Sequence, residues 1–340
     1  MVRSGYGSVG KFYSLLPAIF KRAEGQSRVV GHKSFDTLRF TAGLAALAIM
    51  LQIMLGTLTR LTGSGLACPD WPLCYGFWFP TPTEVAGLVI DYSFAQVMLE
   101  WVHRFNAAVV VAPLVLAVCV FAWRERKLFP VNWRLSIAAL VVLAIQGGVG
   151  GFTVFDQNSP WSVAVHLGLA LILLALVLSL VRLTDVPYHE WRRQAQSNGS
   201  WVVAILGVLV VITMISGAIV AKSGATLSCG GWPLCDGRFI PDFNDTRIAL
   251  HVTHRILALI TVISLLWGSW RWRQLRHLAG LAFVQVLLGA AVIVIYSRHS
   301  MEIQVAIGVV HQTVAMIIFA ALVWSFCSPS VASRVTQKKS

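Results

Sequence analysis

The sequence contains 340 residues, of which 57% are hydrophobic and only 12% are charged. About a quarter of the residues in a soluble domain are charged, so this composition excludes an ordinary soluble protein and indicates a chain that crosses a membrane several times. In a soluble protein the net charge of +13 would suggest nucleic-acid binding. Here the Lys and Arg residues cluster between apolar runs, where they orient membrane helices, so we expect no nucleic-acid partner.

Eight apolar runs are long enough to cross a bilayer, which takes about 20 residues of helix. They are predicted at residues 38–59, 94–122, 136–155, 161–182, 201–221, 248–270, 278–296 and 303–326. The third and fourth runs are separated only by residues 156–160, so they must form a tight helical hairpin. The fold class predicted is an all-α polytopic membrane protein with eight transmembrane helices.

Basic residues lie mainly before the first run, after the second, fourth and sixth runs, and after the eighth. Because Lys and Arg are enriched in cytoplasmic loops, this alternation predicts that both termini are cytoplasmic. The predicted organisation is a cytoplasmic N-terminal segment (1–34), a first four-helix half (35–183), a linker (184–200), a second four-helix half (201–327) and a cytoplasmic tail (328–340).

Both halves carry the same motif after their first apolar run. The segment Gly56–Gly76 aligns without gaps on Gly217–Gly237, and nine of the 21 positions are identical. The alignment extends to three further pairs of polar residues: His103 with His254, Gln146 with Gln285, and His166 with His311. With four spans in each half, both copies would cross the membrane in the same direction. The sequence therefore predicts two tandem four-helix bundles related by internal duplication.

Four histidines are predicted to lie at a similar depth in these bundles: His103, His166, His254 and His311. Each comes early in a helix that runs inward from the outside, about two turns below the surface at a rise of about 1.5 Å per residue. A lone histidine in a membrane helix is usually a packing hydrogen-bonder. Two at matched depth on facing helices are typical of a pair that binds heme iron. We therefore expect each half to hold a heme between its two histidines.

The second run begins with the charged cluster Glu100-Trp-Val-His103-Arg104. Residues three apart share a helix face, so Glu100 and His103 point into the same space. An ionisable group in hydrocarbon costs roughly 2.5 to 3.5 kcal/mol, so it needs a partner or a function. Beside a heme, Glu100 can act as a general base or stabilise developing positive charge. The alternative is a structural ion pair with Arg104.

The equivalent cluster of the second half is His251-Val-Thr-His254-Arg255, which has no acid. The two halves should therefore differ in chemistry, and His251 is either a second-site ligand or a lining residue. Arg104 and Arg255 are placed to pair with heme propionates near the outer surface, or else they are arginines that extend to the membrane interface.

The two outer loops each contain a cysteine pair, Cys68 with Cys74 and Cys229 with Cys235. This spacing, without a nearby histidine, does not suit zinc. An oxidising outer compartment favours paired thiols. We predict two intraloop disulfides that restrain the loops above the histidines, with a redox role as the alternative.

Taken together, these motifs resemble heme A synthases. The resemblance is carried by the following features: Gly56-Thr-Leu-Thr-Arg60-Leu-Thr-Gly63-Ser-Gly65-Leu, Asp70-Trp71-Pro72, the Glu-x-x-His-Arg cluster, and the duplicated histidines. It covers the chain from Phe35 to Phe326 and implies oxidation of the C8 methyl group of heme O to a formyl group, which gives heme A for cytochrome oxidase.

The resemblance also implies roles by position. The first half, with Glu100, His103 and His166, corresponds to the catalytic half, which takes heme O as substrate. His254 and His311 correspond to the ligands of a heme b that carries electrons.

The expected partners are heme O, a heme O synthase that hands over this insoluble substrate, and membrane lipid; a homo-oligomer is left open. We expect the bacterial inner (plasma) membrane rather than the mitochondrial inner membrane. Two other functions compete. A diheme b-type electron carrier usually places its hemes on both sides of the membrane, whereas all four histidines here lie on one side. A heme exporter or chaperone without chemistry would not need Glu100 or the disulfide-prone loops.

Overall fold

The computed structural model describes residues 36–88, 91–184, 200–296 and 300–327. The predicted N-terminal segment 1–34 and tail 328–340 lie outside the described residues, as does the predicted linker except for its two end residues.

Among the described residues, eight helices are long and apolar enough to cross a membrane, and each contains one predicted run. They are the first span Asp36–Leu61, the second span α3 (Phe94–Asn106) to α4 (Ala112–Arg124), α5 (Pro130–Phe155), α6 (Pro160–Leu183), α8 (Ser200–Lys222), α9 (Thr246–Arg271), α10 (Arg276–Tyr296) and α11 (Met301–Phe326). Short helical segments in the connections are η1 (Ser64–Leu66), α2 (Pro82–Ala86), η3 (Ala225–Leu227) and η4 (Arg273–Leu275). The prediction of an all-α membrane protein with eight spans is confirmed.

Local sequence explains where the helices begin. Ser93 caps α3: its side chain accepts from the backbone N–H of Gln96, and the Gln96 side chain accepts from the N–H of Ser93. Gln96 also donates to the carbonyl of Thr62 at 3.0 Å, which ties the start of α3 to the end of the first span. α5 begins at Pro130, six residues before the predicted run at 136–155. Proline suits a first helical turn, and Asn132 donates to the carbonyl of Thr184 at 3.0 Å, so this polar turn packs beside the end of α6.

The second span is not one regular α-helix. Between α3 and α4 the chain forms a turn of π-helix, η2 (Ala107–Val111), directly after the Glu100 to Arg104 cluster. Pro113 lies at the start of α4 and has no N–H to donate to the preceding turn, so the regular hydrogen-bond ladder is interrupted there. π-helical turns often occur at functional sites.

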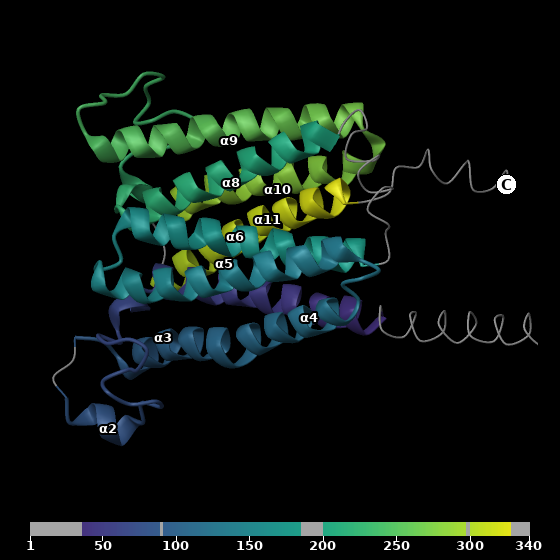
Figure 1. Cartoon of the computed structure of the whole chain (residues 1–340). Coiled ribbons are helices and arrows are strands. Elements are labelled where there is room, and N and C mark those ends of the chain that lie inside the picture. Colours follow the sequence, from purple (N-terminus) through teal and green to yellow (C-terminus); the bar gives the residue numbers. More distant parts are fainter. Residues whose placement is uncertain (1–35, 89–90, 185–199, 297–299, 328–340) are drawn as a thin grey trace, which may run out of the picture.

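The long helices pack side by side in one bundle (Figure 1). We call the four spans from Asp36 to Leu183 the first half and the four spans from Ser200 to Phe326 the second half. α6 contacts α8 and α11, so these three helices join the halves. Their fully buried side chains include Leu171, Leu174 and Met316. The two cysteine-bearing loops lie at one end of the bundle, whereas the start of the first span and the end of α11 lie at the other (Figure 1).

Candidate functional site

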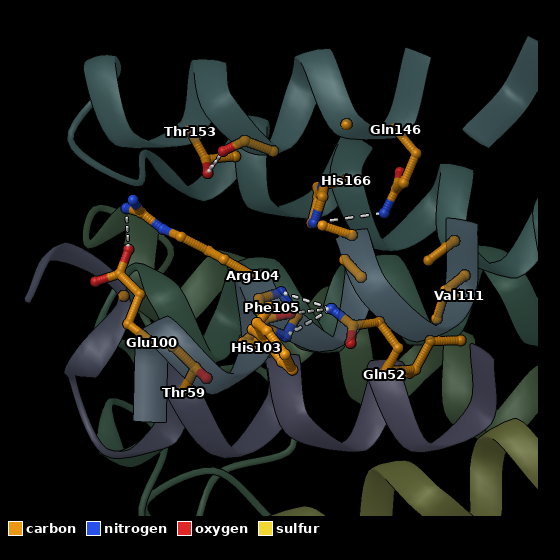
Figure 2. A pocket seen from close by; sticks show the side chains of 18 of the residues that line it. Gln52, Thr59, Glu100, His103, Arg104, Phe105, Val111, Gln146, Thr153 and His166 are labelled. Carbon is orange, nitrogen blue, oxygen red and sulfur yellow. Dashed lines mark hydrogen bonds and ion pairs between the residues drawn. The ribbon is translucent and has the colours of Figure 1, made fainter. Parts of the chain in front are cut away.

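A cavity of about 1110 Å³ lies mainly within the first half. It is bordered by the first span, the second span, α5, α6 and the outer loop, and it contains both His103 and His166 (Figure 2). Ligand pockets usually have volumes of about 300–1,000 Å³, so this cavity can accommodate a large ligand. Glu100, Arg104 and Gln146 also line it.

His103 is held by an amide from the first span. The Nε2 of Gln52 lies 3.0 Å from His103 Nδ1 and donates to the His103 carbonyl at 2.9 Å. Asn106 in turn donates to the Oε1 of Gln52 at 2.7 Å, which fixes the orientation of that amide. The same Nε2 atom of Gln52 lies 3.3 Å from His103 Nε2, so this amide contacts both ring nitrogens and holds the imidazole in place.

His166 lies on the other side of the cavity with Gln146 (Figure 2). Its Nε2 is 3.4 Å from the Nε2 of Gln146. The Nδ1 of His166 and the Oε1 of Gln146 are buried and have no hydrogen-bond partner among the described residues. His103 and His166 both line the cavity. The structure thus brings the two predicted ligands of the first half to one cavity.

Each of the four candidate ligands lies against a glycine on a neighbouring helix. A Cβ atom at Gly56 would lie 3.0 Å from Cε1 of His103, and one at Gly150 would lie 3.0 Å from Cε1 of His166. Gly217 and Gly289 have the same relation to His254 and His311, at 3.0 and 3.3 Å respectively. These glycines leave space in which the Cε1 atom of each imidazole approaches the neighbouring helix.

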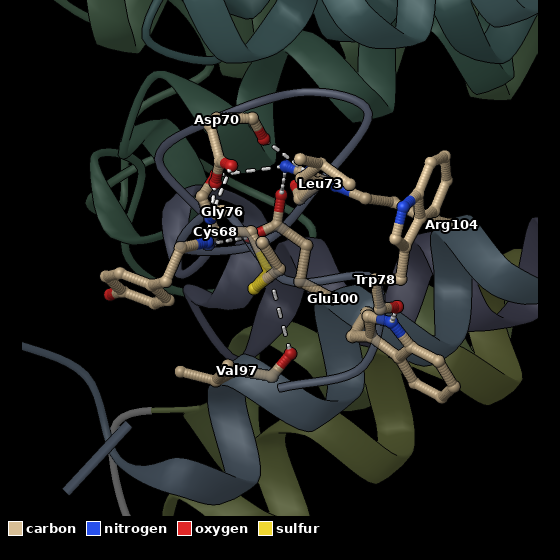
Figure 3. Close-up of a disulfide and its surroundings, with 11 residues drawn as sticks. Cys68, Asp70, Leu73, Gly76, Trp78, Val97, Glu100 and Arg104 are labelled. Carbon is tan, nitrogen blue, oxygen red and sulfur yellow. Dashed lines mark hydrogen bonds and ion pairs between the residues drawn. A yellow bond between two sulfur atoms is a disulfide. The ribbon is translucent and has the colours of Figure 1, made fainter. Parts of the chain in front are cut away.

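Glu100 is buried, with a relative exposure of 4%, beneath the first outer loop. Its Oε1 accepts from Arg104 Nη2 at 2.6 Å, and its Oε2 accepts from the backbone N–H of Cys68 at 2.8 Å (Figure 3). The structure therefore contains the ion pair that the sequence offered as one of two roles for Glu100. The same carboxylate lines the cavity.

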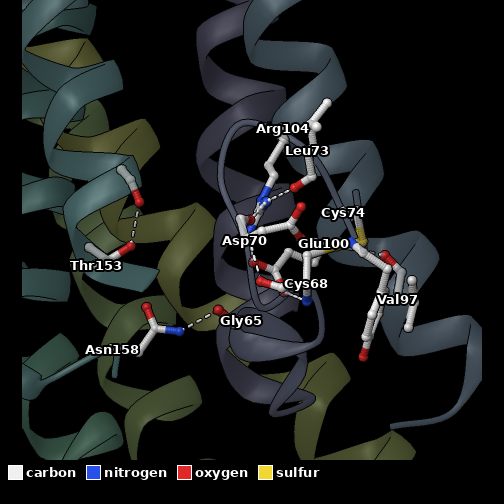
Figure 4. Close-up of polar contacts among 12 residues, drawn as sticks. Gly65, Cys68, Asp70, Leu73, Cys74, Val97, Glu100, Arg104, Thr153 and Asn158 are labelled. Carbon is white, nitrogen blue, oxygen red and sulfur yellow. Dashed lines mark hydrogen bonds and ion pairs between the residues drawn. A yellow bond between two sulfur atoms is a disulfide. The ribbon is translucent and has the colours of Figure 1, made fainter. Parts of the chain in front are cut away.

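Arg104 fixes the loop above the cavity. Besides Glu100, its Nη atoms donate to the carbonyls of Cys68, Asp70 and Leu73 (Figure 4). Both Nη groups of Arg104 therefore donate to groups of the protein itself, which does not favour the predicted pairing of Arg104 with propionates. A second contact holds the same loop: Asn158, in the α5–α6 hairpin, donates to the carbonyl of Gly65.

Arg255 does the same in the second half. Its Nη atoms donate to the carbonyls of Cys229 at 2.8 Å, Gly231 at 3.0 Å and Leu234 at 3.0 Å. Like Arg104, it stabilises the backbone of an outer loop.

Both predicted disulfides are present, Cys68 with Cys74 and Cys229 with Cys235. In the first loop, Asp70 accepts from the backbone N–H groups of Tyr75 and Gly76, at 2.6 and 2.8 Å. The disulfide and this turn close a compact loop directly above Glu100 (Figure 3). The prediction of two intraloop disulfides is confirmed.

In the second half, His254 has a hydroxyl where His103 has an amide. Ser216 Oγ lies 2.8 Å from His254 Nδ1 and donates to the carbonyl of Thr213 at 2.8 Å. Since the single hydroxyl proton is used, the serine oxygen accepts from the imidazole Nδ1–H. This contact leaves Nε2 of His254 as the atom with a free lone pair.

His311 is contacted by Gln285, whose Nε2 is 3.2 Å from His311 Nδ1. His251 is buried with a relative exposure of 4%, and its Nδ1 has no hydrogen-bond partner among the described residues.

Comparison with known proteins identifies the family. Residues 39–323 match the family described as cytochrome oxidase assembly protein. The chain belongs to this family. Among its relatives are heme A synthases from Alkalihalophilus pseudofirmus and Shouchella clausii, each 26% identical, which align over 84% and 86% of this chain and 95% of each relative. A heme A synthase from Shewanella oneidensis is 28% identical over 81% of this chain and 91% of the relative. The family resemblance predicted from the motifs is confirmed.

Two polar residues that contact the histidines, Gln52 and Ser216, were not predicted from the sequence as residues of the site. Gln52 precedes Gly56 by one helical turn and is a lone amide in an apolar run, which is a usable signal. Ser216 directly precedes Gly217 and carries no such mark, because serine is common in membrane helices.

Proposed function

We propose that this protein is a heme A synthase that oxidises the C8 methyl group of heme O to a formyl group in the first-half cavity. The observation that carries the proposal is the convergence of His103, His166 and Glu100 on one large cavity, in a chain whose family includes heme A synthases. Heme O is the substrate of the proposed reaction.

The residues of the cavity fit a porphyrin. Two imidazoles face the same space, and Gly56 and Gly150 leave the gaps in which they lie. The unpartnered Nδ1 of His166 is a buried polar atom that needs a partner, and iron ligation or reorientation of the ring would supply one. These features support His103 and His166 as ligands of the substrate iron.

Written with water as the oxygen donor, the proposed reaction converts R–CH3 and H2O into R–CHO and releases four protons and four electrons, in two two-electron stages. The electrons pass to one-electron acceptors, and the protons to bases in the cavity and to solvent. Glu100 lines the cavity and uses one acceptor site on each carboxylate oxygen for Arg104 and Cys68. A carboxylate has about four acceptor sites, so Glu100 can still accept a hydrogen bond or a proton from an oxidised methyl group. His251 occupies the equivalent position in the second half, which supports chemistry in the first half only.

We further propose that His254 and His311 hold a resident heme b. The contact with Ser216 fixes the His254 tautomer that leaves Nε2 free, as is usual for a metal-ligating histidine whose other nitrogen donates to a neighbour. Gly217 and Gly289 leave space for the two rings. A heme held there would supply a one-electron acceptor within the same bundle.

The remaining parts of the proposal concern origin and surroundings. The matching contacts of the two halves support an internal duplication, with Gly56, His103 and Gly150 corresponding to Gly217, His254 and Gly289. The distribution of basic residues supports cytoplasmic termini in a bacterial inner membrane. Because heme O is insoluble, we propose that a heme O synthase delivers it through the lipid.

The deciding experiment is pigment extraction from membranes that contain the full chain and a supply of heme O. A synthase yields a formyl heme, identified by mass and by its pyridine hemochrome spectrum. A host with the same heme O supply but without the chain is the control. Unchanged heme O bound to the chain would support a carrier or chaperone, and heme b alone would support an electron carrier; either result would contradict the proposal.

A further inference from the structure

The first-half cavity contains two cationic side chains that its protein contacts do not neutralise. Four charged residues line it: Arg60, Glu100, Arg104 and Lys222. Glu100 and Arg104 pair with each other. We propose that Arg60 and Lys222 form a carboxylate-binding subsite that holds the propionates of the heme substrate. This inference rests on the proposed function, because it names residues that position the substrate in the same cavity.

Arg60 is only partly satisfied by the protein. Its Nη2 donates to Oε1 of Gln312, on α11, at 2.6 Å. Its Nε is buried and has no hydrogen-bond partner among the described residues. A guanidinium has five N–H donors in a planar fork that matches a carboxylate. Arg60 therefore retains donors for an anionic ligand in the cavity.

Lys222 is the last residue of α8 and makes no hydrogen bond or ion pair with the described part of the chain. It lines the same cavity as Arg60, so two positive charges face one space. Two like charges beside an apolar cavity are unfavourable unless a counter-charge joins them. Among the described residues that line the cavity, the only acid is Glu100, which Arg104 already neutralises. A ligand with carboxylates would supply the missing negative charge.

Arg60 lies at a depth in the bundle that suits a heme bound between His103 and His166. Arg60 follows Gly56 by four residues, one helical turn nearer the outer loops, and Gly56 lies against the ring of His103. Glu100 precedes His103 by three residues, so it also lies about one turn nearer the outer loops. A macrocycle at the level of the histidines would thus have its propionates at the level of Arg60 and its outward edge at the level of Glu100.

This placement has a consequence for which methyl group reacts. In heme, the C8 methyl group and one propionate are substituents of the same pyrrole ring. Fixing that propionate at Arg60 and Lys222 therefore fixes the adjacent methyl group on the outward edge, beside Glu100. The C5 methyl group stands in the same relation to the other propionate, whereas the C1 and C3 methyl groups lie on the two pyrrole rings that carry no propionate. Arg60 and Lys222 would act as positioning residues that restrict the outward edge to the C8 and C5 methyl groups.

The test is a binding titration of the purified full chain with its resident heme retained. Hemin, which has two free propionates, and hemin dimethyl ester, which has none, are added separately and followed by the Soret difference spectrum. A His103→Ala chain measures binding outside the first-half cavity. We expect the wild-type chain to prefer hemin by about tenfold, the factor that a charge-assisted hydrogen bond commonly supplies.

Lys222→Gln and Arg60→Gln should each reduce this preference to about twofold and leave the affinity for the ester unchanged, whereas Lys222→Arg should keep the preference. Equal wild-type affinity for the two ligands would overturn the subsite. A proportional loss for both ligands in the Gln variants would also overturn it, because it would indicate a structural role.

Gln312→Leu distinguishes two possible roles of Arg60, binding a propionate and contacting the second half. The substitution removes the hydrogen-bond partner of Arg60 on α11 without changing the charge of the cavity. It should keep the preference for hemin; a loss equal to that of Arg60→Gln would assign Arg60 to the contact between the halves instead. Formation of the formyl heme is measured separately. If the chain makes formyl heme but shows no preference for hemin over its dimethyl ester, the proposed function stands and the proposed subsite is wrong.

Discussion

Glu100 combines two tasks that are usually separate in a membrane helix. Its carboxylate accepts from Arg104 and from the N–H of Cys68, so it stabilises the loop above the cavity. It also lines the cavity in which we propose the substrate binds. A negative charge in this position is compensated by Arg104, so it is tolerated in a membrane-spanning helix.

Replacing Glu100 with glutamine should stop the oxidation and leave the second heme site intact. The amide keeps the size of the side chain and one acceptor oxygen but cannot take up a proton. General-base catalysis typically contributes 10²–10⁴-fold, so we expect at least about a 100-fold fall in the rate of heme A formation. The measurement is the ratio of heme A to heme O in extracted pigments, with resident heme b per chain determined in parallel.

Glu84→Gln is the matched control for this substitution. Glu84 is an exposed carboxylate in the capping box of α2, where glutamine serves equally well, and it does not line the cavity. Its heme A output should be normal. Normal output from Glu100→Gln would remove Glu100 from the mechanism.

At the scale of single helices, α5 shows how glycine positions a candidate ligand. Gly150 lies against the His166 ring, whereas a Cβ at Gly148 on the same helix would meet nothing within 4 Å. Gly150→Val should displace the imidazole and weaken hemin binding in the first half by about tenfold or more, through loss of ligand geometry. Gly148→Val should bind normally, because its side chain enters open space. Both variants change helix propensity equally, so equal affinities in a Soret titration would contradict the proposed role of Gly150.

The helices could be predicted more fully than the contacts between them. The apolar runs located all eight spans, because about 20 residues of hydrocarbon-compatible sequence leave few alternatives to a helix. The π-helical turn at Ala107–Val111 was not predicted, although Pro113 marks the place where the ladder is interrupted. Arg104 was expected near propionates, but the loop carbonyls that occupy it come from residues about 30 positions away. Helical periodicity predicts which residues share a helix face, but it does not predict that the loop after the first span folds back onto Arg104.

At the scale of the whole molecule, the two halves present similar histidine pairs in different surroundings. The Gln52 amide contacts both ring nitrogens of His103, whereas the Ser216 hydroxyl contacts Nδ1 of His254. The first-half cavity is also completed by two residues from the second half, Lys222 and Gln312. Neither difference could be predicted from the aligned motifs alone. The alignment covers the loops and the paired histidines, and it contains neither Gln52 nor Ser216. These differences are compatible with the proposed division, in which the second half holds a cofactor and the first half exchanges its ligand.

This division predicts different consequences for equivalent mutations. His254→Ala should remove heme b from the purified full chain, because it deletes the ligand whose tautomer Ser216 fixes for iron binding. His103→Ala, the same change in the first half, should leave the heme b content near that of the wild type while abolishing heme A formation. Pyridine hemochrome analysis, expressed as heme b per chain, measures the first effect, and pigment extraction measures the second. Unchanged heme b in His254→Ala, or equal loss from both variants, would mean that the resident heme is not held by His254 and that the halves are not specialised in this way.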